Sequence, residues 1–185
     1  SSLPKIEKYH ANFYTEKQLK QLLEHVIGDN IESAVKLTAF YGFRRSEVCG
    51  LRWSAIDFDE KVINVNHTAI KINGETRYQD KCKNESSFRR LPLSKSMSEY
   101  LKELKKRQEQ NKELYGDSYH ESDYVCRWAD GTPITPDYLT HHFQVVISKN
   151  NLPYIRFHDL RHPYVKHTTK IFSLRLKFFQ AQPVL

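Results

Sequence analysis

The chain has 185 residues, the size of one domain that can bury a hydrophobic core. Its net charge of +7 favours a polyanionic partner, and no apolar run approaches the roughly 18 residues of a membrane span. Three widely spaced cysteines without a CxxC pair argue against a disulfide framework or a zinc site. We therefore expect a globular protein of a reducing cytoplasm.

The first half of the sequence predicts three helices. Thr15 and Gln18 form a capping box, and leucines and valines follow at helical spacing. A second helix over about 31–41 ends at Gly42, a typical C-cap. A short third helix over 46–51 follows directly.

The pattern then changes to strands. Residues 62–66 alternate between apolar and polar, and residues 68–72 are β-prone. Asn73-Gly74 is a two-residue hairpin signal. We expect residues 88–93 to form a third strand, which closes a small three-stranded antiparallel sheet.

Helical signals return in the second half. Residues 96–99 read as a capping box for a long, charged and solvated helix that runs to about residue 114. Thr135 and Pro136 form an N-cap followed by proline, which predicts a helix ending near Asn150. The expected fold is mainly α with the small sheet inserted.

Two basic signatures stand far apart in the chain. One is Gly42-Phe43-Arg44-Arg45-Ser46-Glu47, and the other is Phe157-His158-Asp159-Leu160-Arg161-His162, which reads HxxR. On a helix, residues three apart lie about 60° apart around the axis, so His158 and Arg161 share a face. If Arg44 folds against them, two guanidiniums and an imidazole without a carboxylate cluster suit a phosphodiester.

These segments, together with Lys83 between them, resemble the catalytic domain of the tyrosine recombinases, the phage integrase family. The resemblance runs from about residue 14 to residue 162. The motifs are specific in combination, because Gly50-Leu51-Arg52-Trp53 follows the first signature and Arg89-Arg90-Leu91-Pro92-Leu93 follows the lysine.

The resemblance implies a reaction without metal or cofactor. In the family, a tyrosine attacks double-stranded DNA to form a 3′-phosphotyrosyl bond, which a 5′ hydroxyl then resolves. It also implies self-association on DNA and a bacterial or phage context. The implied catalytic residues are Arg44, Lys83, His158 and Arg161, with Glu47 orienting Arg44, and the implied DNA-binding residues are Arg45, Lys81, Arg89 and Arg90.

Each of these roles has a plainer alternative. Arg44 and Glu47 are spaced as an ordinary surface ion pair, and His158 as a buried, satisfied histidine. Lys83 lies in the polar segment 81–87, which also reads as a solvated basic turn. His141 and His142 lack a third ligand at metal spacing, so we expect no metal there, and we expect the two tryptophans in the core.

The resemblance stops after HxxR. Pro163 stands where the family continues with a buried helix, and no tyrosine follows Tyr164. We expect neither Tyr154 nor Tyr164 to act as nucleophile, so the chain resembles an intact front joined to a truncated or frame-shifted tail. This divides the chain into a linker (1–12), a catalytic-like domain (13–162) and an atypical tail (163–185).

Two other classes of function remain open from the residues alone. One is a DNA-binding module without catalysis on the same scaffold. The other is a related type IB topoisomerase, which has a similar phosphate site.

Overall fold

The computed structural model describes residues 13–80 and 88–161. Five α-helices, five strands and three 3₁₀ helices make up this part of the chain. In chain order they are α1 (Glu16–His25), α2 (Glu32–Tyr41), α3 (Arg45–Cys49), η1 (Trp53–Ala55), β1 (Ile56–Asp57), β2 (Val62–Val65), β3 (His67–Ile72), β4 (Glu75–Asp80), β5 (Arg89–Pro92), α4 (Lys95–Tyr115), η2 (Gly116–Ser118), α5 (Pro136–Lys149) and η3 (Phe157–Arg161). The mainly helical fold with small antiparallel sheets is the predicted class.

Local capping signals place the helix ends of the first half. Thr15 and Gln18 form both halves of the capping box at the start of α1. Gly42 ends α2 in the left-handed region, with φ of 68°, and its N–H donates to the carbonyl of Thr38. Both features confirm the sequence prediction. Each depends only on residues fewer than five positions apart, so the local sequence is enough to predict it.

The strands form two sheets rather than the single expected sheet. β1, β2 and β5 make a three-stranded antiparallel sheet, whereas β3 and β4 form a separate hairpin. The hairpin turns at Asn73 and Gly74, both with positive φ, as predicted. The strand expected at 88–93 forms as β5 and lies in the three-stranded sheet: it pairs with β2, and the short β1, which was not predicted from the sequence, completes that sheet.

The two later helices agree with the sequence except at one cap. Thr135 caps α5 with Pro136 at its first turn, as expected. Helix α4 begins earlier than predicted, because Ser94 rather than Ser96 is its N-cap and accepts from the N–H of Met97. Ser94 is also held from outside the helix, since its own N–H donates to the Tyr41 hydroxyl at 3.1 Å.

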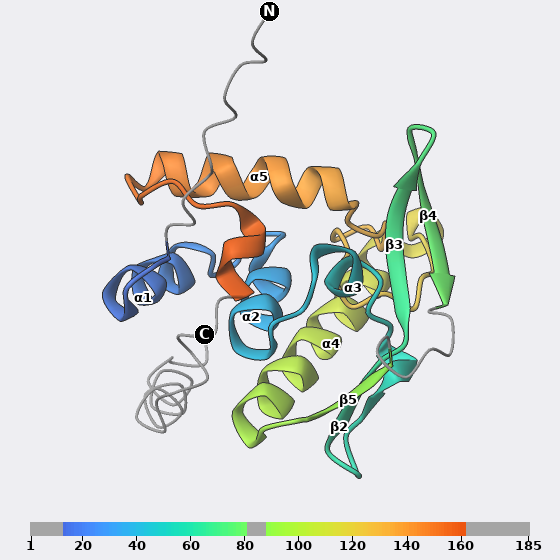
Figure 1. Ribbon diagram of the computed structural model, residues 1–185. Helices are drawn as coiled ribbons and strands as arrows, with labels where there is room; N and C mark the ends of the chain where they lie inside the picture. Colours follow the sequence, from blue (N-terminus) through green and yellow to red (C-terminus); the bar gives the residue numbers. More distant parts are fainter. Residues whose placement is uncertain (1–12, 81–87, 162–185) are drawn as a thin grey trace, which may run out of the picture.

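Helix α2 lies in the middle of the domain, with η3 beside it and α4 running diagonally below it (Figure 1). Its side chains Ala34, Val35 and Leu37 are fully buried in the core. Helix α3 packs against β3 so closely that a Cβ on Gly50 would stand 2.6 Å from the Cα of Thr68. Glycine at this position therefore brings the β3–β4 hairpin against the short helix that begins next to Arg44.

Other predictions concern the two tryptophans, the histidine pair, membrane-spanning helices and the terminal segments. Trp53 is buried and Trp128 is partly buried against the core. His142 bonds Asp29 at 2.9 Å and stacks on Tyr138. No helix within 13–80 and 88–161 is long and apolar enough to cross a membrane. The predicted linker and tail lie outside the described residues.

Candidate functional site

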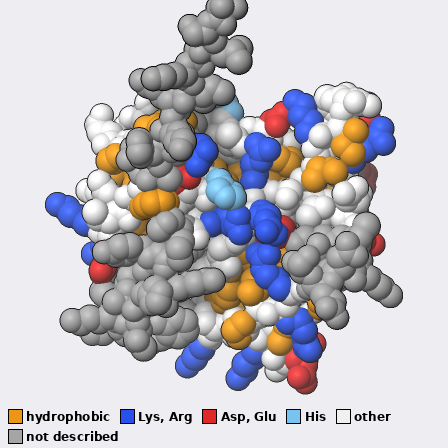
Figure 2. Space-filling view, in the orientation of Figure 1, with side chains coloured by type: hydrophobic (Ala, Val, Ile, Leu, Met, Phe, Trp, Pro, Cys, Tyr) orange, Lys and Arg blue, Asp and Glu red, His pale blue; other side chains and the backbone are white. Residues whose placement is uncertain are grey.

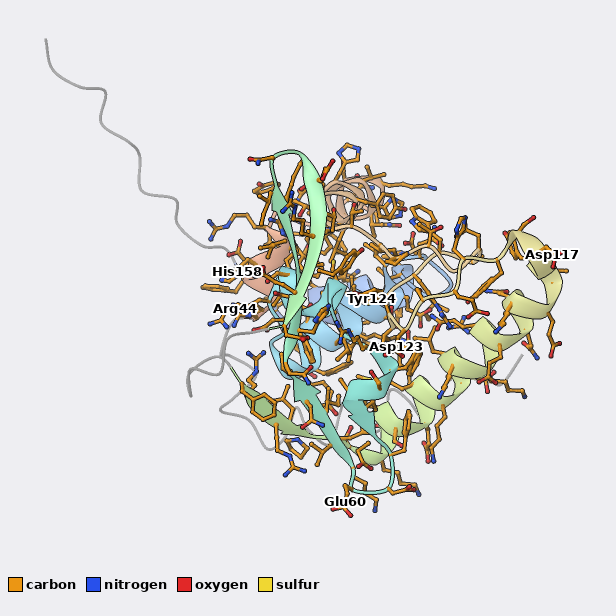
Figure 3. The ribbon with its side chains drawn as sticks, turned by 90° about the vertical axis from the view of Figure 1, so that its right-hand side faces the viewer. Arg44, Glu60, Asp117, Asp123, Tyr124 and His158 are labelled. Carbon is orange, nitrogen blue, oxygen red and sulfur yellow. The ribbon has the colours of Figure 1, made fainter. Side chains whose placement is uncertain are left out.

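Three segments that are distant in sequence meet at the C-terminal end of α2. They are the start of α3, the start of β5 and the 3₁₀ helix η3, which bring Arg44, Arg89 and Arg161 together. Figure 3 shows Arg44 and His158 next to each other on one side of the domain, away from the far end of α4 at Asp117. The structure thus brings together the two signatures that the sequence separates by more than 100 residues.

Glu47 is the centre of this cluster. Its side chain is fully buried, and its two oxygens accept four hydrogen bonds. Arg44 donates from its backbone N–H at 2.7 Å and from Nη1 at 3.0 Å. Arg89 donates from Nη1 at 3.0 Å and from Nη2 at 2.8 Å. Arg44 keeps 54% of its side chain exposed, so its guanidinium is held at one side and open to solvent on the other.

Gly42 supplies a second acceptor. The Nε of Arg161 donates to the Gly42 carbonyl at 2.8 Å, and the Nη2 of Arg89 approaches the same oxygen at 3.4 Å. This carbonyl is at the C-terminus of α2, where the helix dipole favours cations. The end of α2 therefore anchors both arginines from the inside.

The HxxR residues lie on a 3₁₀ helix rather than on the expected α-helix. Residues three apart are nearly eclipsed in a 3₁₀ helix, so His158 Nε2 and Arg161 Nη1 come within 3.4 Å. Asp159 between them is buried and holds the turn, because its carboxylate accepts from the N–H and the guanidinium of Arg156.

The cluster carries more positive than negative charge. The guanidiniums of Arg44 and Arg89 bond the carboxylate of Glu47, and that of Arg161 lies near enough for the charges to interact. Figure 2 shows arginine or lysine side chains gathered beside a histidine on this face. Partial burial, and then Arg161, hold the pKa of His158 below its usual value. Burial and the charge of Arg44 likewise lower the pKa of Arg161. Such an arrangement favours an anion that would supply the missing negative charge.

The remaining predicted site residues are placed elsewhere. Arg45 turns away from the cluster and donates to the Thr140 hydroxyl of α5 at 2.8 Å. Arg90 is exposed on β5, next to Arg89. Lys81 and Lys83 lie outside the described residues. Tyr154 is 59% exposed in the segment after α5.

Sequence reasoning missed two parts of the cluster. Arg89 was assigned to DNA, yet it faces inward opposite the buried Val65 of β2. The signal was present, since Arg89, Leu91 and Leu93 alternate on one side of the strand. The bond between Arg156 and Asp159 was also missed, although an Arg–Asp spacing of three is a common ion pair.

Nothing within residues 13–80 and 88–161 gathers three or more histidine, cysteine or acidic side chains into a group that could hold a metal ion. The cluster itself offers guanidinium and imidazole donors around one buried carboxylate.

Comparison with known proteins places this arrangement in context. The chain is 28% identical over 171 residues to "Tyrosine recombinase XerC-like" of Caldanaerobacter subterraneus, covering 86% of this chain and 43% of that protein. It is 24% identical over 155 residues to "ICEBs1 integrase" of Bacillus subtilis, covering 83% of this chain and 42% of that protein. The chain thus spans less than half the length of these relatives.

Solved structures share the fold. The Tn1549 transposon integrase in complex with circular intermediate DNA has a TM-score of 0.71 at 18% identity, over 96% of this chain and 60% of that one. XerA recombinase has a TM-score of 0.59 at 19% identity, over 97% of this chain and 56% of that one. The sequence pattern of the Phage integrase family matches residues 12–169. The chain belongs to the phage integrase family.

Proposed function

We propose that this chain is the phosphate-binding part of a tyrosine recombinase catalytic domain, which acts in site-specific recombination of double-stranded DNA. The observation that carries the proposal is the surplus of positive charge around Glu47: Arg44 and Arg89 bond its buried carboxylate, and Arg161 adds a third guanidinium beside them at the Gly42 carbonyl. A DNA phosphate at this position would balance the charge.

The residues have distinct roles in this proposal. Arg44 and Arg161 clamp the scissile phosphate through the donors that do not face Glu47 and Gly42. His158 donates an N–H to a non-bridging oxygen: partial burial and Arg161 lower its pKa and so favour the neutral imidazole, which keeps one N–H donor. Catalysis of this kind is positioning and charge stabilisation by side chains.

Lys83 completes the proposed set. In the sequence it lies between β4, which ends at Asp80, and β5, which begins with Arg89 at the cluster. A lysine in the connection between them protonates the leaving 5′ hydroxyl in this scheme, aided by neighbouring arginines that lower the pKa of an amine. Lys81, Arg45 and Arg90 are proposed as contacts to the DNA backbone, and the protein self-associates on DNA.

The first test is the salt dependence of DNA binding. Affinity for a duplex should fall by orders of magnitude between roughly 50 and 200 mM salt if about six or more phosphates are neutralised. Fluorescence anisotropy of a labelled duplex measures it, and a flat dependence contradicts the proposal.

The second test separates chemistry from binding. We expect this 185-residue polypeptide to form no covalent adduct on a nicked suicide substrate. In-line attack needs a phenolic oxygen about 3 Å from the phosphorus, and we expect neither Tyr154 nor Tyr164 to supply one. Mass spectrometry of the reaction decides: an adduct on Tyr154 or Tyr164 would overturn the expectation. Salt-dependent binding without an adduct leaves the chain as a phosphate-binding scaffold that needs a nucleophile from elsewhere.

A further inference from the structure

We propose that Arg89 is a positioning residue of the phosphate site: it locks Glu47, and through Glu47 the guanidinium of Arg44, without itself touching DNA. The inference rests on the proposed function, and it assigns Arg89 a different role from the DNA contact that the sequence predicts.

The first support is the complete use of the Glu47 carboxylate. A carboxylate has about four acceptor positions, and Arg44 and Arg89 each fill two of them. Because the side chain of Glu47 is fully buried, loss of either arginine would leave a desolvated negative charge undercompensated. The orientation of the Arg44 guanidinium therefore depends on the two bonds that the Arg89 guanidinium makes to the same carboxylate.

The second support is where the donors of Arg89 point. Both Nη atoms face Glu47, and Nη2 also approaches the Gly42 carbonyl, which Arg161 uses as well. The guanidinium lies 5.8 Å from the centre of the Phe43 ring, and 31% of the side chain is exposed. Arg44, with 54% exposed, is the more open of the two. Arg89 is thus connected to Arg44 through the Glu47 carboxylate and to Arg161 through the Gly42 carbonyl.

The third support is the strand register. Arg89 pairs with Val65, which is buried, and Arg90 pairs with Asn64 on the opposite face of β5. Neighbouring residues of one strand point to opposite faces, so the chain provides an inward and an outward arginine side by side. Arg89 is therefore the inward member of this pair of arginines.

The requirement is for the shape of arginine and not for its charge. A guanidinium makes two parallel bonds to a carboxylate, whereas an ammonium is a point charge. Arg89→Lys keeps the net charge of the site and loses the paired bonds. This variant separates positioning from simple charge attraction.

The experiment uses the whole chain and inorganic phosphate at constant ionic strength. Binding is followed by the His158 ring signals in NMR, and the Nε–Hε signals of the arginines are recorded without ligand. Arg89→Lys should shift or broaden the Arg44 signal and weaken phosphate binding about tenfold. Arg77→Lys, at an exposed position of β4 that pairs with Ile70, should leave the Arg44 signal and phosphate affinity unchanged.

A double-mutant cycle decides between positioning and direct contact. If Arg89 acts through Arg44, Arg89→Lys has no further effect on phosphate affinity in an Arg44→Lys background. If the two losses multiply, Arg89 contacts the anion directly and the proposal is overturned. Should Arg89→Lys fail to fold by circular dichroism, Glu47→Gln combined with Arg89→Gln replaces it, since this pair removes both charges together. That double variant should also shift the Arg44 signal, and an unmoved signal overturns the proposal.

The failure of the proposed function would look different. If the unsubstituted chain binds neither phosphate nor DNA, the function fails. The Arg44 signal still reports on Arg89 in that case: an unmoved signal in Arg89→Lys contradicts positioning, and a shifted one supports it.

Discussion

Two polar clusters in this domain are built from similar residues but differ in their balance of positive and negative charge. Around Glu47, Arg44 and Arg89 bond one buried carboxylate, and Arg161 lies beside them at a face open to solvent. At the base of the β3–β4 hairpin, buried His67 bonds Asp80 at 2.7 Å and lies 2.8 Å from the Nη2 of Arg52. Arg52 and Asp80 are also paired at 3.6 Å, so this second cluster has one cation for one anion.

The difference teaches how to recognise a ligand site among ion pairs. In the His67 cluster the histidine is buried and stacks on the rings of Tyr78 and Tyr124, and Arg52 is paired with Asp80, so the cluster joins the hairpin to the body of the domain. Among the described residues the Glu47 cluster has an excess of positive charge, which a bound anion would neutralise. Excess charge, rather than the number of charged residues, distinguishes the candidate site.

The largest expected effect is on stability at Glu47. Glu47→Ala should lower the free energy of unfolding by about 3 kcal/mol, because it leaves two arginines facing each other without the carboxylate between them. Urea denaturation measures the loss. Asp80→Ala is the control in the second cluster, and since Asp80 is 77% exposed we expect a clearly smaller loss. Equal losses would contradict the contrast between the clusters.

The next effect concerns DNA. Arg44→Gln should weaken duplex binding about tenfold and reduce the slope of log affinity against log salt by about 1, as expected for one lost phosphate contact. Arg52→Gln in the balanced cluster should leave the slope unchanged. Anisotropy titrations over a range of salt concentrations compare them, and a reduced slope in both variants would show that net charge alone matters.

A third effect depends on pH. Burial and Arg161 lower the pKa of His158, so below about pH 6.5 the unfolded chain binds a proton before the folded chain does, and stability falls as pH falls. A bound DNA phosphate favours the charged imidazole, so duplex affinity should rise from pH 7 to pH 5.5. His158→Gln should abolish this rise and His67→Gln should preserve it. Binding titrations at constant salt test both.

The smallest effect is at the edge of the balanced cluster. Tyr124 donates to or accepts from His67 Nε2 at 3.2 Å, and Tyr124→Phe removes that bond. We expect a loss of about 1 kcal/mol in unfolding free energy and duplex affinity within about twofold of the unsubstituted chain. A larger change in affinity would mean that the hairpin base is coupled to the phosphate site.

The sequence alone was sufficient to predict those features whose physical cause lies in a few neighbouring residues. The capping box at Thr15, the C-cap at Gly42 and the Asn73-Gly74 turn are all determined by adjacent residues, and all were predicted. The choice of Ser94 over Ser96 as N-cap was not, because two serines offer equivalent local signals and a contact with Tyr41 holds the first.

The features that could not be predicted from the sequence depend on pairing between segments that are far apart in the chain. Nothing in residues 88–93 says that β5 pairs with β2 instead of with the hairpin. The resemblance to a family supplied Arg44, His158 and Arg161 before any geometry was known, and the structure brings the three together. The inward role of Arg89 needed the register of β5, which the sequence alone does not provide.

The bond between Arg161 and the Gly42 carbonyl spans 119 residues. Contacts over such separations form late, because closing a long loop has a high entropic cost before any bond compensates for it. A growing chain on the ribosome would carry Gly42 and Arg44 long before Arg161 emerges. The two halves of the cluster would therefore join only after Arg161 has emerged, and until then the growing chain would present scattered basic charge rather than a formed phosphate site.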